Sequence, residues 1–548
     1  MKENKILWFA SFTAVYAVLA GYVFWGTWSM GVVPIMPDCA TSFPYDYIGD
    51  WMAKWRESGK FIPSDLTIFL GSPYFWVELQ YALAGYLAAL GVAYYCRGRG
   101  LSRLAAYGAG LLLAFCGYWF SLFSAGHLGW FQWMMYGVFA FGLADRAVRK
   151  NKAKNWILLG ACVAWGSFRQ PDLWLLFTVF TAAYFIWCCI RERKLPNWKG
   201  VAIAAVTFFA IAAPSLRGAA ADKARRESDI AEMHDDGSAL TGGGIEDVSA
   251  KEAQWIFVTN WSLPPRETIE FIVPRINGDT SCQMTLVLGQ SQGTGVKPYT
   301  GALGRPINAK MGNYRQHSLY VGLVTCILAA IGIFCGLRDR KREVAFFLAS
   351  GILFYLLSLG RNFEPLYRVV FALPVGDSIR APVKWHHLTE LCICICAAYG
   401  IGYLRTLLAK RMPLRTATMI VAAIVVAGVC DLARIDRLYC AAHTADTQVG
   451  PLPQPIPPDP AAALRLRQAA AANGFKVVGT SRMPFQTRSG NVREMDVLMV
   501  EQKSPRPSVH KPESTMTGIP LALAWLSLFS TFAAMIISAF LAFKPSRR

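Results

Sequence analysis

Three aspartates follow directly on the first strongly apolar segment of the chain, within the stretch PDCATSFPYDYIGDW at residues 37–51. Carboxylate oxygens are the ligands that Mg²⁺ and similar cations prefer, and one carboxylate alone can act as a general base. A carboxylate at a membrane boundary is usually functional when it faces a cavity, although an ordinary loop or an interfacial aromatic helix would also carry such residues. The candidates for catalysis, or for holding a divalent cation such as Mg²⁺ or Mn²⁺, are Asp38, Asp46 and Asp50.

Basic and imidazole side chains gather in a second stretch, SIRAPVKWHHLTEL at residues 378–391. An arginine binds phosphate through two parallel hydrogen bonds, and a lysine binds it as a compact positive charge. The ordinary alternative is that these long side chains reach up to lipid headgroups. The candidates for substrate binding in this stretch are Arg380, Lys384, His386 and His387.

Two shorter polar turns separate apolar segments, at residues 120–133 and 166–174. A lone histidine, as in the first turn, is more often packed or hydrogen-bonded than bound to a ligand. In the second turn, Pro171 suits the first position of a helix and Asp172 suits its positive end, so capping alone explains this aspartate. Capping does not explain the two polar residues before it, which require a polar cavity or a headgroup. The candidates for substrate binding in these turns are His127, Arg169, Gln170 and Asp172.

The elements that must position these residues are apolar helices. Of the 548 residues 54% are hydrophobic and only 16% are charged, whereas a soluble protein carries about 25% charged residues. Apolar runs near the length needed to cross a bilayer recur along the whole chain. We therefore predict an all-α polytopic membrane protein with about twelve transmembrane helices. The predicted spans are residues 6–28, 76–96, 104–121, 127–144, 156–168, 172–190, 200–216, 318–337, 344–360, 385–404, 416–430 and 517–543.

The distribution of charge predicts the orientation of these spans. With the N-terminus in the cytoplasm, the inner segments are short and basic and together carry 25 Lys and Arg against 5 Asp and Glu. They therefore account for the whole net charge of +20, as the bias of inner loops toward Lys and Arg predicts. Both termini are then cytoplasmic, and the basic composition gives no reason to expect a nucleic-acid partner. The stretch at 378–391 is predicted to face outward. Basic residues are unusual on that side of the membrane, so their presence there favours a binding site for a phosphate group.

All the long connecting segments are predicted to face outward. A membrane domain at residues 1–430 carries outer loops at 29–75, 217–317 and 361–384. A small α/β unit with proline-rich linkers is predicted outside the membrane at 431–516, because helix-forming residues precede an Asn-Gly stop and two short β-like runs. Residues 517–548 form the last span and a basic cytoplasmic tail. No nucleotide-binding or hydrolase motif is present.

The order of these motifs resembles that of the bacterial YfhO-type membrane proteins, within the GT-C class of polyprenyl-phosphate-dependent glycosyltransferases. The resemblance covers roughly residues 1–405. One departure affects Gln170, since FRQPD stands where the family has Gly-His-Pro-Gln. The matching stretches are ESGKFIPSDLTIFLGSP at 57–73, Gly126–His127, TNWSLPPRETIEFIVPRINGDTS at 259–281, SLYVGLVTCILAAIG at 318–332 and SIRAPVKWHHLTEL.

The resemblance implies transfer of a sugar from a polyprenyl-phosphate donor to an envelope glycan, lipid or protein acceptor, on the outer face of the bacterial cytoplasmic membrane. It implies an inverting reaction with an aspartate of the first outer loop as the base. Spacing to Gly59 favours Asp38, then Asp46, then Asp50. Arg380 and Lys384 would stabilise the departing phosphate, and a divalent cation could share that task.

Two other classes of function are compatible with the same residues. A transporter or flippase of a lipid-linked or anionic envelope precursor would carry charged residues in the middle of helices and broken spans, whereas the predicted helix centres are mostly uncharged. A non-catalytic membrane scaffold would display the outer segments without needing the polar turns.

Overall fold

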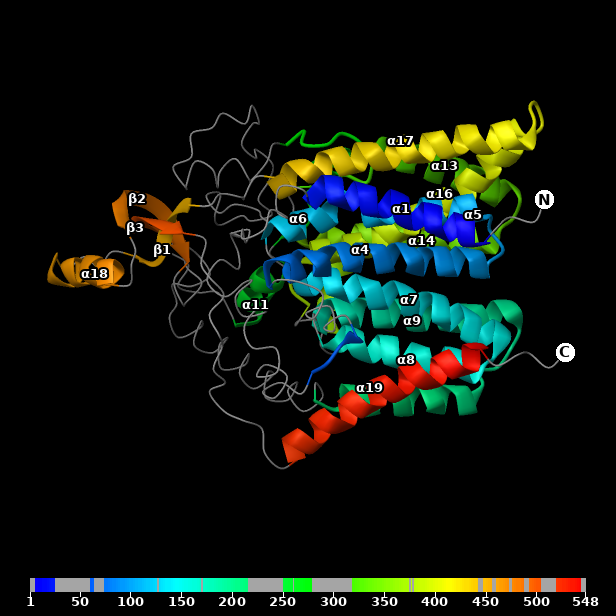
Figure 1. Cartoon of the computed structure of the whole chain (residues 1–548), viewed down its shortest axis with the longest axis horizontal. Helices are drawn as coiled ribbons and strands as arrows, with labels where there is room; N and C mark the ends of the chain where they lie inside the picture. Colours follow the sequence, from blue (N-terminus) through cyan, green and yellow to red (C-terminus); the bar gives the residue numbers. More distant parts are fainter. Residues whose placement is uncertain are drawn as a thin grey trace.

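Long helices that run side by side form most of the structure, and a small sheet lies beyond one end of the bundle (Figure 1). In this computed structural model, α1 begins and α19 ends at the opposite end of the bundle, the right side of Figure 1. The structure describes residues 5–24, 60–63, 73–125, 128–168, 171–214, 250–259, 261–277, 318–373, 376, 379–441, 447–455, 460–472, 476–486, 492–503 and 519–543.

The helices come in two groups along the chain, separated by residues 215–249, which lie outside the described residues. The first half contributes α1 (Lys5–Phe24), α4 (Pro73–Gly98), α5 (Arg103–Ala114), α6 (Gly117–Ala125), α7 (Leu128–Lys150), α8 (Ala153–Ser167), α9 (Pro171–Glu192) and a helix at Trp198–Pro214. The second half contributes α11 (Ala250–Val258), α13 (Leu323–Arg338), α14 (Arg342–Ser358), α15 (Glu364–Ala372), α16 (His386–Leu408), α17 (Leu414–Ala441) and α19 (Ile519–Phe543). Short 3₁₀ helices lie at η2 (Pro265–Phe271), η3 (Gly360–Phe363) and η5 (Pro382–Trp385).

Within the described residues, five helices are long and apolar enough to cross a membrane. A sixth is added if α14 and the bent segment Gly360–Ala372, which turns by 114° from it, count as one span. These helices are compatible with a membrane protein. Helices also occupy the other predicted spans, and several of them are shorter or less apolar, so twelve spans stays a prediction. The five are Ile6–Phe24, Arg103–Leu122, Asp172–Glu192, Pro382–Leu408 and Leu414–Leu438.

Two helix boundaries differ from those expected from hydrophobicity. The chain is extended at 318–322, and α13 begins only at Leu323, because the Tyr320 carbonyl accepts a hydrogen bond from Gly117 N and Gly322 has a φ of +97°. At its other end, α17 continues past the predicted residue 430 to Ala441. Its last turns mix buried apolar residues with charged ones, so the uniform apolar run that marks a span is missing there.

Glycines allow the closest helix contact in the bundle, between α13 and α16. A Cβ added at Gly332 would overlap the carbonyl oxygen of Cys396, and one at Gly400 would overlap that of Leu328. Small residues that let two backbones meet are typical of helix pairs in membranes. These two glycines therefore set the distance between the two helices.

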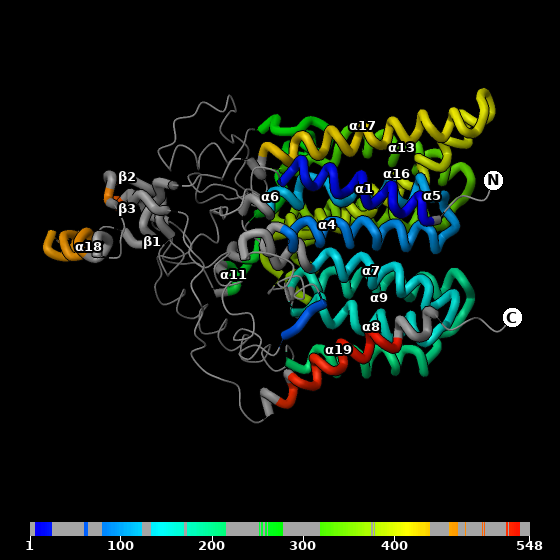
Figure 2. Tube along the Cα trace, viewed as in Figure 1, coloured from blue at the N-terminus to red at the C-terminus, as the bar shows by residue number. Residues whose placement is uncertain are grey.

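The last helix returns to pack on the middle of the chain. Figure 2 shows the α19 tube lying along α8. The indole Nε1 of Trp165 in α8 donates a hydrogen bond to Thr531 Oγ1 in α19 over 3.2 Å, and both residues are buried. This contact links residues that are far apart in the sequence.

A fully buried aspartate ties three predicted inner turns together. The carboxylate of Asp145 accepts hydrogen bonds from Arg99 Nη1 at 3.2 Å, Arg149 Nε at 3.0 Å and Tyr184 Oη at 3.1 Å. Arg99 also pairs with Glu343, at the start of α14. The basic turns after α4, α7 and α13 therefore meet at one end of the bundle, where ion pairs offset part of their charge.

Residues 447–503 contain an antiparallel three-stranded sheet. Its strands are β1 (Thr447–Pro455), β2 (Lys476–Gln486) and β3 (Val492–Lys503), in the order β1-β3-β2, and α18 (Pro460–Ala472) precedes β2. The register pairs Val449 with Glu501 and Thr480 with Leu498. The first half of the predicted proline-rich linker thus forms a strand, which is possible because β1 lies at the edge of the sheet.

Candidate functional site

Backbone hydrogen bonds join residues 258–259 and 261–263 to residues 379–385, two segments that are predicted to face outward and that we call the outer platform. Ala381 N donates to Val258 O over 3.0 Å, although these residues are more than a hundred positions apart. Ala381 has a φ of +64°, in the left-handed region that non-glycine residues seldom adopt. Such backbone strain persists only where surrounding contacts hold it in place, and it often marks a functional site.

An ion pair connects two of the turns that were predicted separately to bind substrate. Lys384 Nζ of η5 contacts Asp172 Oδ2 in the first turn of α9. The lysine side chain is 4% exposed and the aspartate side chain 17% exposed. Asp172 Oδ1 also accepts a hydrogen bond from Leu173 N at 2.9 Å. The aspartate therefore holds the lysine at the helix start, and a phosphate would have to compete with a carboxylate for it.

Arg380 is the most accessible of the described basic candidates. Its guanidinium lies 4.5 Å from the centre of the Trp261 ring, and the residue is partly exposed. Arginine binds planar and tetrahedral anions through paired hydrogen bonds and also stacks on aromatic rings. The outer platform thus presents one arginine whose orientation is set by a tryptophan.

The two histidines are buried inside the protein rather than exposed at the outer boundary. His386 Nε2 lies 3.7 Å from Glu390 Oε1, and His387 Nδ1 lies 3.6 Å from Glu390 Oε2. The His387 ring packs against Trp119 with 4.3 Å between ring centres, and the His386 ring packs against Phe271 at 4.5 Å. We call His386, His387 and Glu390 the imidazole–carboxylate cluster. Its aromatic surroundings separate it from the surface.

A second buried carboxylate belongs to the same neighbourhood and was not among the predicted site residues. Asp436 of α17 is 0% exposed, and it interacts electrostatically with Glu390. Neither of its carboxylate oxygens has a hydrogen-bond partner in the described part of the chain. Charged residues inside membrane bundles are rare and usually functional. The sequence pattern that could have indicated Asp436 is the amphipathic end of α17, where this aspartate lies among apolar residues.

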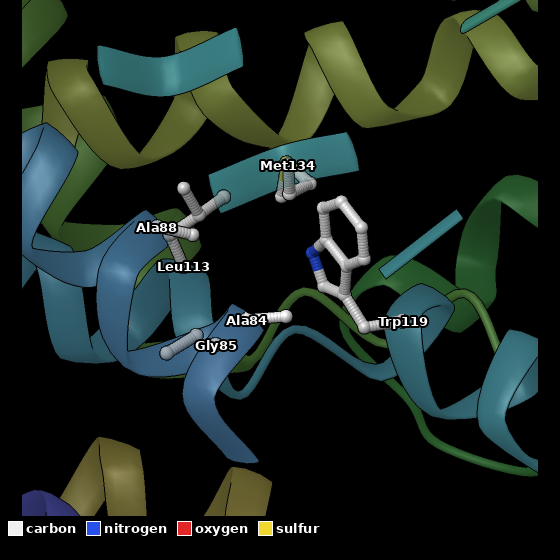
Figure 3. A pocket seen from close by; sticks show the side chains of 7 residues that line it. Ala84, Gly85, Ala88, Leu113, Trp119 and Met134 are labelled. Atoms are coloured by element: carbon white, nitrogen blue, oxygen red, sulfur yellow. The ribbon is translucent and has the colours of Figure 1, made fainter. Parts of the chain in front are cut away.

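A small apolar pocket lies next to the imidazole–carboxylate cluster. Figure 3 shows the Trp119 indole facing Ala84, Ala88 and Met134 across this pocket. The same tryptophan ring also packs against His387. Trp119 therefore contacts both the apolar pocket and the polar cluster.

The remaining sequence candidates lie outside the described residues, so the structure neither joins them to the cluster nor separates them from it. Within the parts of the chain that the structure describes, no group of three His, Cys, Asp or Glu side chains could hold a metal ion. The predicted carboxylate set lies outside those parts of the chain. The candidates outside the described residues are Asp38, Asp46, Asp50, His127, Arg169 and Gln170.

Comparison with known proteins returns no relative. No family model, curated protein or solved structure matches the chain. The resemblance to the YfhO-type proteins therefore continues to rest on the motifs alone, and function is argued from the geometry of the outer end.

That geometry can do two kinds of chemistry. Arg380 can accept an oxyanion at the edge of the outer platform, because arginine remains charged at any physiological pH. The imidazole–carboxylate cluster and Asp436 place groups that can each bind a proton inside the bundle, where such groups are usually functional.

Proposed function

We propose that the chain is an inverting membrane glycosyltransferase. It moves a sugar from a polyprenyl-phosphate donor to an envelope glycan, lipid or protein acceptor on the outer face of the bacterial cytoplasmic membrane. One observation carries this proposal: polar side chains from turns far apart in sequence meet at one end of the bundle, around the contact between Lys384 and Asp172. A lipid-anchored phosphate is the substrate that such an end would meet at the headgroup level.

The proposed topology has twelve spans with both termini in the cytoplasm. It is supported by the meeting of the basic turns around Asp145, at the end opposite to the outer platform. The ends of α1 and α19 also lie there (Figure 1). In this arrangement the donor phosphate lies at the outer membrane surface, next to Arg380.

In the proposed reaction, the hydroxyl oxygen of the acceptor attacks the anomeric carbon from the side opposite the phosphate. The acceptor proton passes to an aspartate of the first outer loop, with Asp38 as first candidate. The bond between the anomeric carbon and the phosphate oxygen breaks, and its electron pair leaves with the lipid phosphate. Arg380 stabilises the charge that develops on that phosphate as the bond breaks. Lys384 keeps Asp172 and the outer platform in position.

The substitution Asp38→Asn is expected to reduce transfer by at least a hundredfold, in line with the loss of a general base. The change is nearly isosteric, so we expect the amount of folded protein to stay the same. The measurement is mass spectrometry of membrane lipids from a strain lacking the gene, restored with the wild type or the variant. A polyprenyl-phosphate sugar should accumulate in the deletion strain and with Asp38→Asn, but not with the wild type.

Asp46→Asn and Asp50→Asn are the matched controls, because they make the same change in the same loop. Full activity of Asp38→Asn together with an inactive Asp46→Asn would assign the base to Asp46. If the lipid pool of the deletion strain is unchanged while the gene is expressed, the transferase proposal is wrong.

The substitution Arg380→Ala is expected to raise the KM for the donor by roughly tenfold to a hundredfold, the range for a hydrogen bond to a charged group. The KM for the acceptor should change little. The control is Arg368→Ala, because Arg368 also lies over a tryptophan, Trp255 at 3.8 Å, but pairs with Glu364 and Glu252. Equal effects of Arg380→Ala on both substrates would rule out a phosphate-specific role.

A flippase or transporter of a lipid-linked envelope precursor is the second candidate, and two observations favour it. Glu390 and Asp436 are fully buried, and the segment after α14 turns by 114°. The two functions are distinguished by the side of the membrane on which the lipid-linked sugar accumulates. With a missing transferase, externally added periodate should oxidise the sugar, whereas with a missing flippase the sugar should be protected until the membrane is opened. A scaffold function predicts normal lipids in every outer-turn variant.

A further inference from the structure

A cavity of about 390 Å³ lies at the inner end of the bundle, between the turn that joins α7 to α8 and the turn that follows α9. This volume is within the range of small-ligand sites. The ends of α7 and α9 that line it lie at the opposite end of the bundle from α11 (Figure 1). The proposed transferase function uses none of the residues that line it.

One side of the cavity is strongly basic. Arg149, Lys150 and Lys194 line it. Arg149 is already engaged, since its Nη2 donates to Gly98 O over 2.7 Å and to Asp145 Oδ2. Neither Lys150 nor Lys194 forms an ion pair within the described parts of the chain. Two ammonium groups are therefore available to an anion.

Lys150 lies among several other cations, and of these Arg149 is paired with a carboxylate, that of Asp145. Partial burial, and after it the nearby cations Arg146, Arg149, Lys152 and Lys154, lowers the pKa of the Lys150 ammonium. A group of like charges at close range costs free energy unless an anion joins it. This cavity is thus prepared for a negatively charged ligand.

Polar contacts hold the wall of the cavity in a defined shape. Asn151, with a φ of +43°, accepts hydrogen bonds on its Oδ1 from Trp156 Nε1 at 3.0 Å and from Asn197 Nδ2 at 2.5 Å. These bonds connect the α7–α8 turn to the turn after α9. The spacing of the two free lysines is therefore set by the fold rather than by the motion of two separate loops.

The other side of the cavity is apolar and continues onto a surface of lipid-facing character. Trp156, Phe185 and Leu195 line this side, and Leu195 is 91% exposed. Trp198, three residues further on, is 71% exposed. Exposed tryptophans next to basic residues are typical of the boundary between a membrane and water.

We propose that this cavity binds a phosphate group, and that the phosphodiester headgroup of an anionic phospholipid is its source. The phosphate lies between Lys150 and Lys194, while the acyl chains follow the apolar side past Leu195. Basic pockets between membrane helices on the cytoplasmic side are a known setting for such headgroups. This inference is independent of the proposed transferase activity, since it concerns the opposite end of the bundle.

The test is native mass spectrometry of the purified full-length chain in detergent, with phosphatidylglycerol or phosphatidylcholine added. The wild type should retain phosphatidylglycerol in preference to phosphatidylcholine. The double variant Lys150→Gln/Lys194→Gln should bind phosphatidylglycerol roughly tenfold to thirtyfold more weakly. The variant Lys150→Arg/Lys194→Arg should keep most of the binding, which excludes misfolding as the cause of a loss.

The matched control is Lys152→Gln/Lys154→Gln, which also removes two positive charges near the cavity but changes no residue of the cavity lining. It should weaken binding by less than about twofold. Equal losses in the two Gln variants, or equal binding of the two lipids by the wild type, would overturn the proposal. Inorganic phosphate and glycerol phosphate are added as soluble competitors. If either displaces the lipid at millimolar concentration, the cavity binds phosphate, but its ligand is a soluble phosphate compound rather than a lipid.

Discussion

Replacing Lys384 with methionine is expected to lower the free energy of unfolding by about 3 kcal/mol. The physical reason is that Lys384 Nζ contacts Asp172 Oδ2, and both side chains are largely buried. Removing the ammonium leaves a carboxylate without its main partner in a low-dielectric surrounding. The measurement is the thermal unfolding of the purified chain in detergent.

A double-mutant cycle identifies the cause of this loss. Lys384→Met combined with Asp172→Leu should recover a large part of the stability, because no unpaired charge then remains. Lys410→Met, at an exposed lysine in the turn before α17, should change stability by less than about 0.5 kcal/mol. Additive effects of the two site substitutions would show that the pair does not stabilise the outer end.

The same variants separate a structural role of Lys384 from a catalytic one. If Lys384 positions the platform, the double variant should regain donor binding together with stability. If its ammonium binds the donor phosphate, the double variant should be stable while the KM for the donor stays high. The contact with Asp172 leads us to expect the first result.

Gly400→Ala is expected to destabilise the membrane bundle by about 1–3 kcal/mol. The new Cβ would overlap the carbonyl oxygen of Leu328 in α13, and backbone atoms cannot move aside as a flexible side chain can. The two helices would have to separate along their length. We expect a lower midpoint of thermal unfolding and a lower yield of folded protein from membranes.

The control for this prediction lies two residues further along the same helix. A Cβ added at Gly402 would meet no atom within 4 Å. Gly402→Ala should therefore be neutral, or stabilising by up to about 1 kcal/mol through its better helix propensity. If the two alanine variants behave alike, the contact between α13 and α16 is looser than the structure has it.

The apolar helices and the basic turns could be predicted because each depends on the local chemistry of one segment. Leu, Ile and Phe runs near 20 residues long favour helices wherever they occur, and five of those helices are long and apolar enough for a membrane. The basic turns could be predicted for the same reason, because their Lys and Arg residues are local in sequence. The ion pairs of Arg99 and Arg149 with Asp145 bring these turns together at one end of the bundle. Hydrophobicity alone did not predict the end of α17, because charged residues appear there while the helix continues.

The candidate site was predicted by residue type, but its arrangement was not. The sequence marked Arg380, Lys384 and Asp172 as outward polar residues, and the fold brings the last two into contact across 212 positions. It also marked His386 and His387 as groups that meet substrate, whereas the structure buries both behind aromatic rings. Burial depends on which distant elements cover a residue, and that information is absent from the residue's own neighbourhood.

Tertiary packing therefore decided which polar groups share a cluster. Asp436 joins the neighbourhood of Glu390 because α17 continues along α16, and no spacing rule connects these two positions. Ala381 adopts a left-handed backbone because a hydrogen bond to Val258 holds it there. Local composition determines where the helices and the charged turns lie, since hydrophobic transfer is a property of each segment. The pairing of buried charges is a property of the whole bundle, because a charge in a low-dielectric interior is stable only beside the partner that the fold provides.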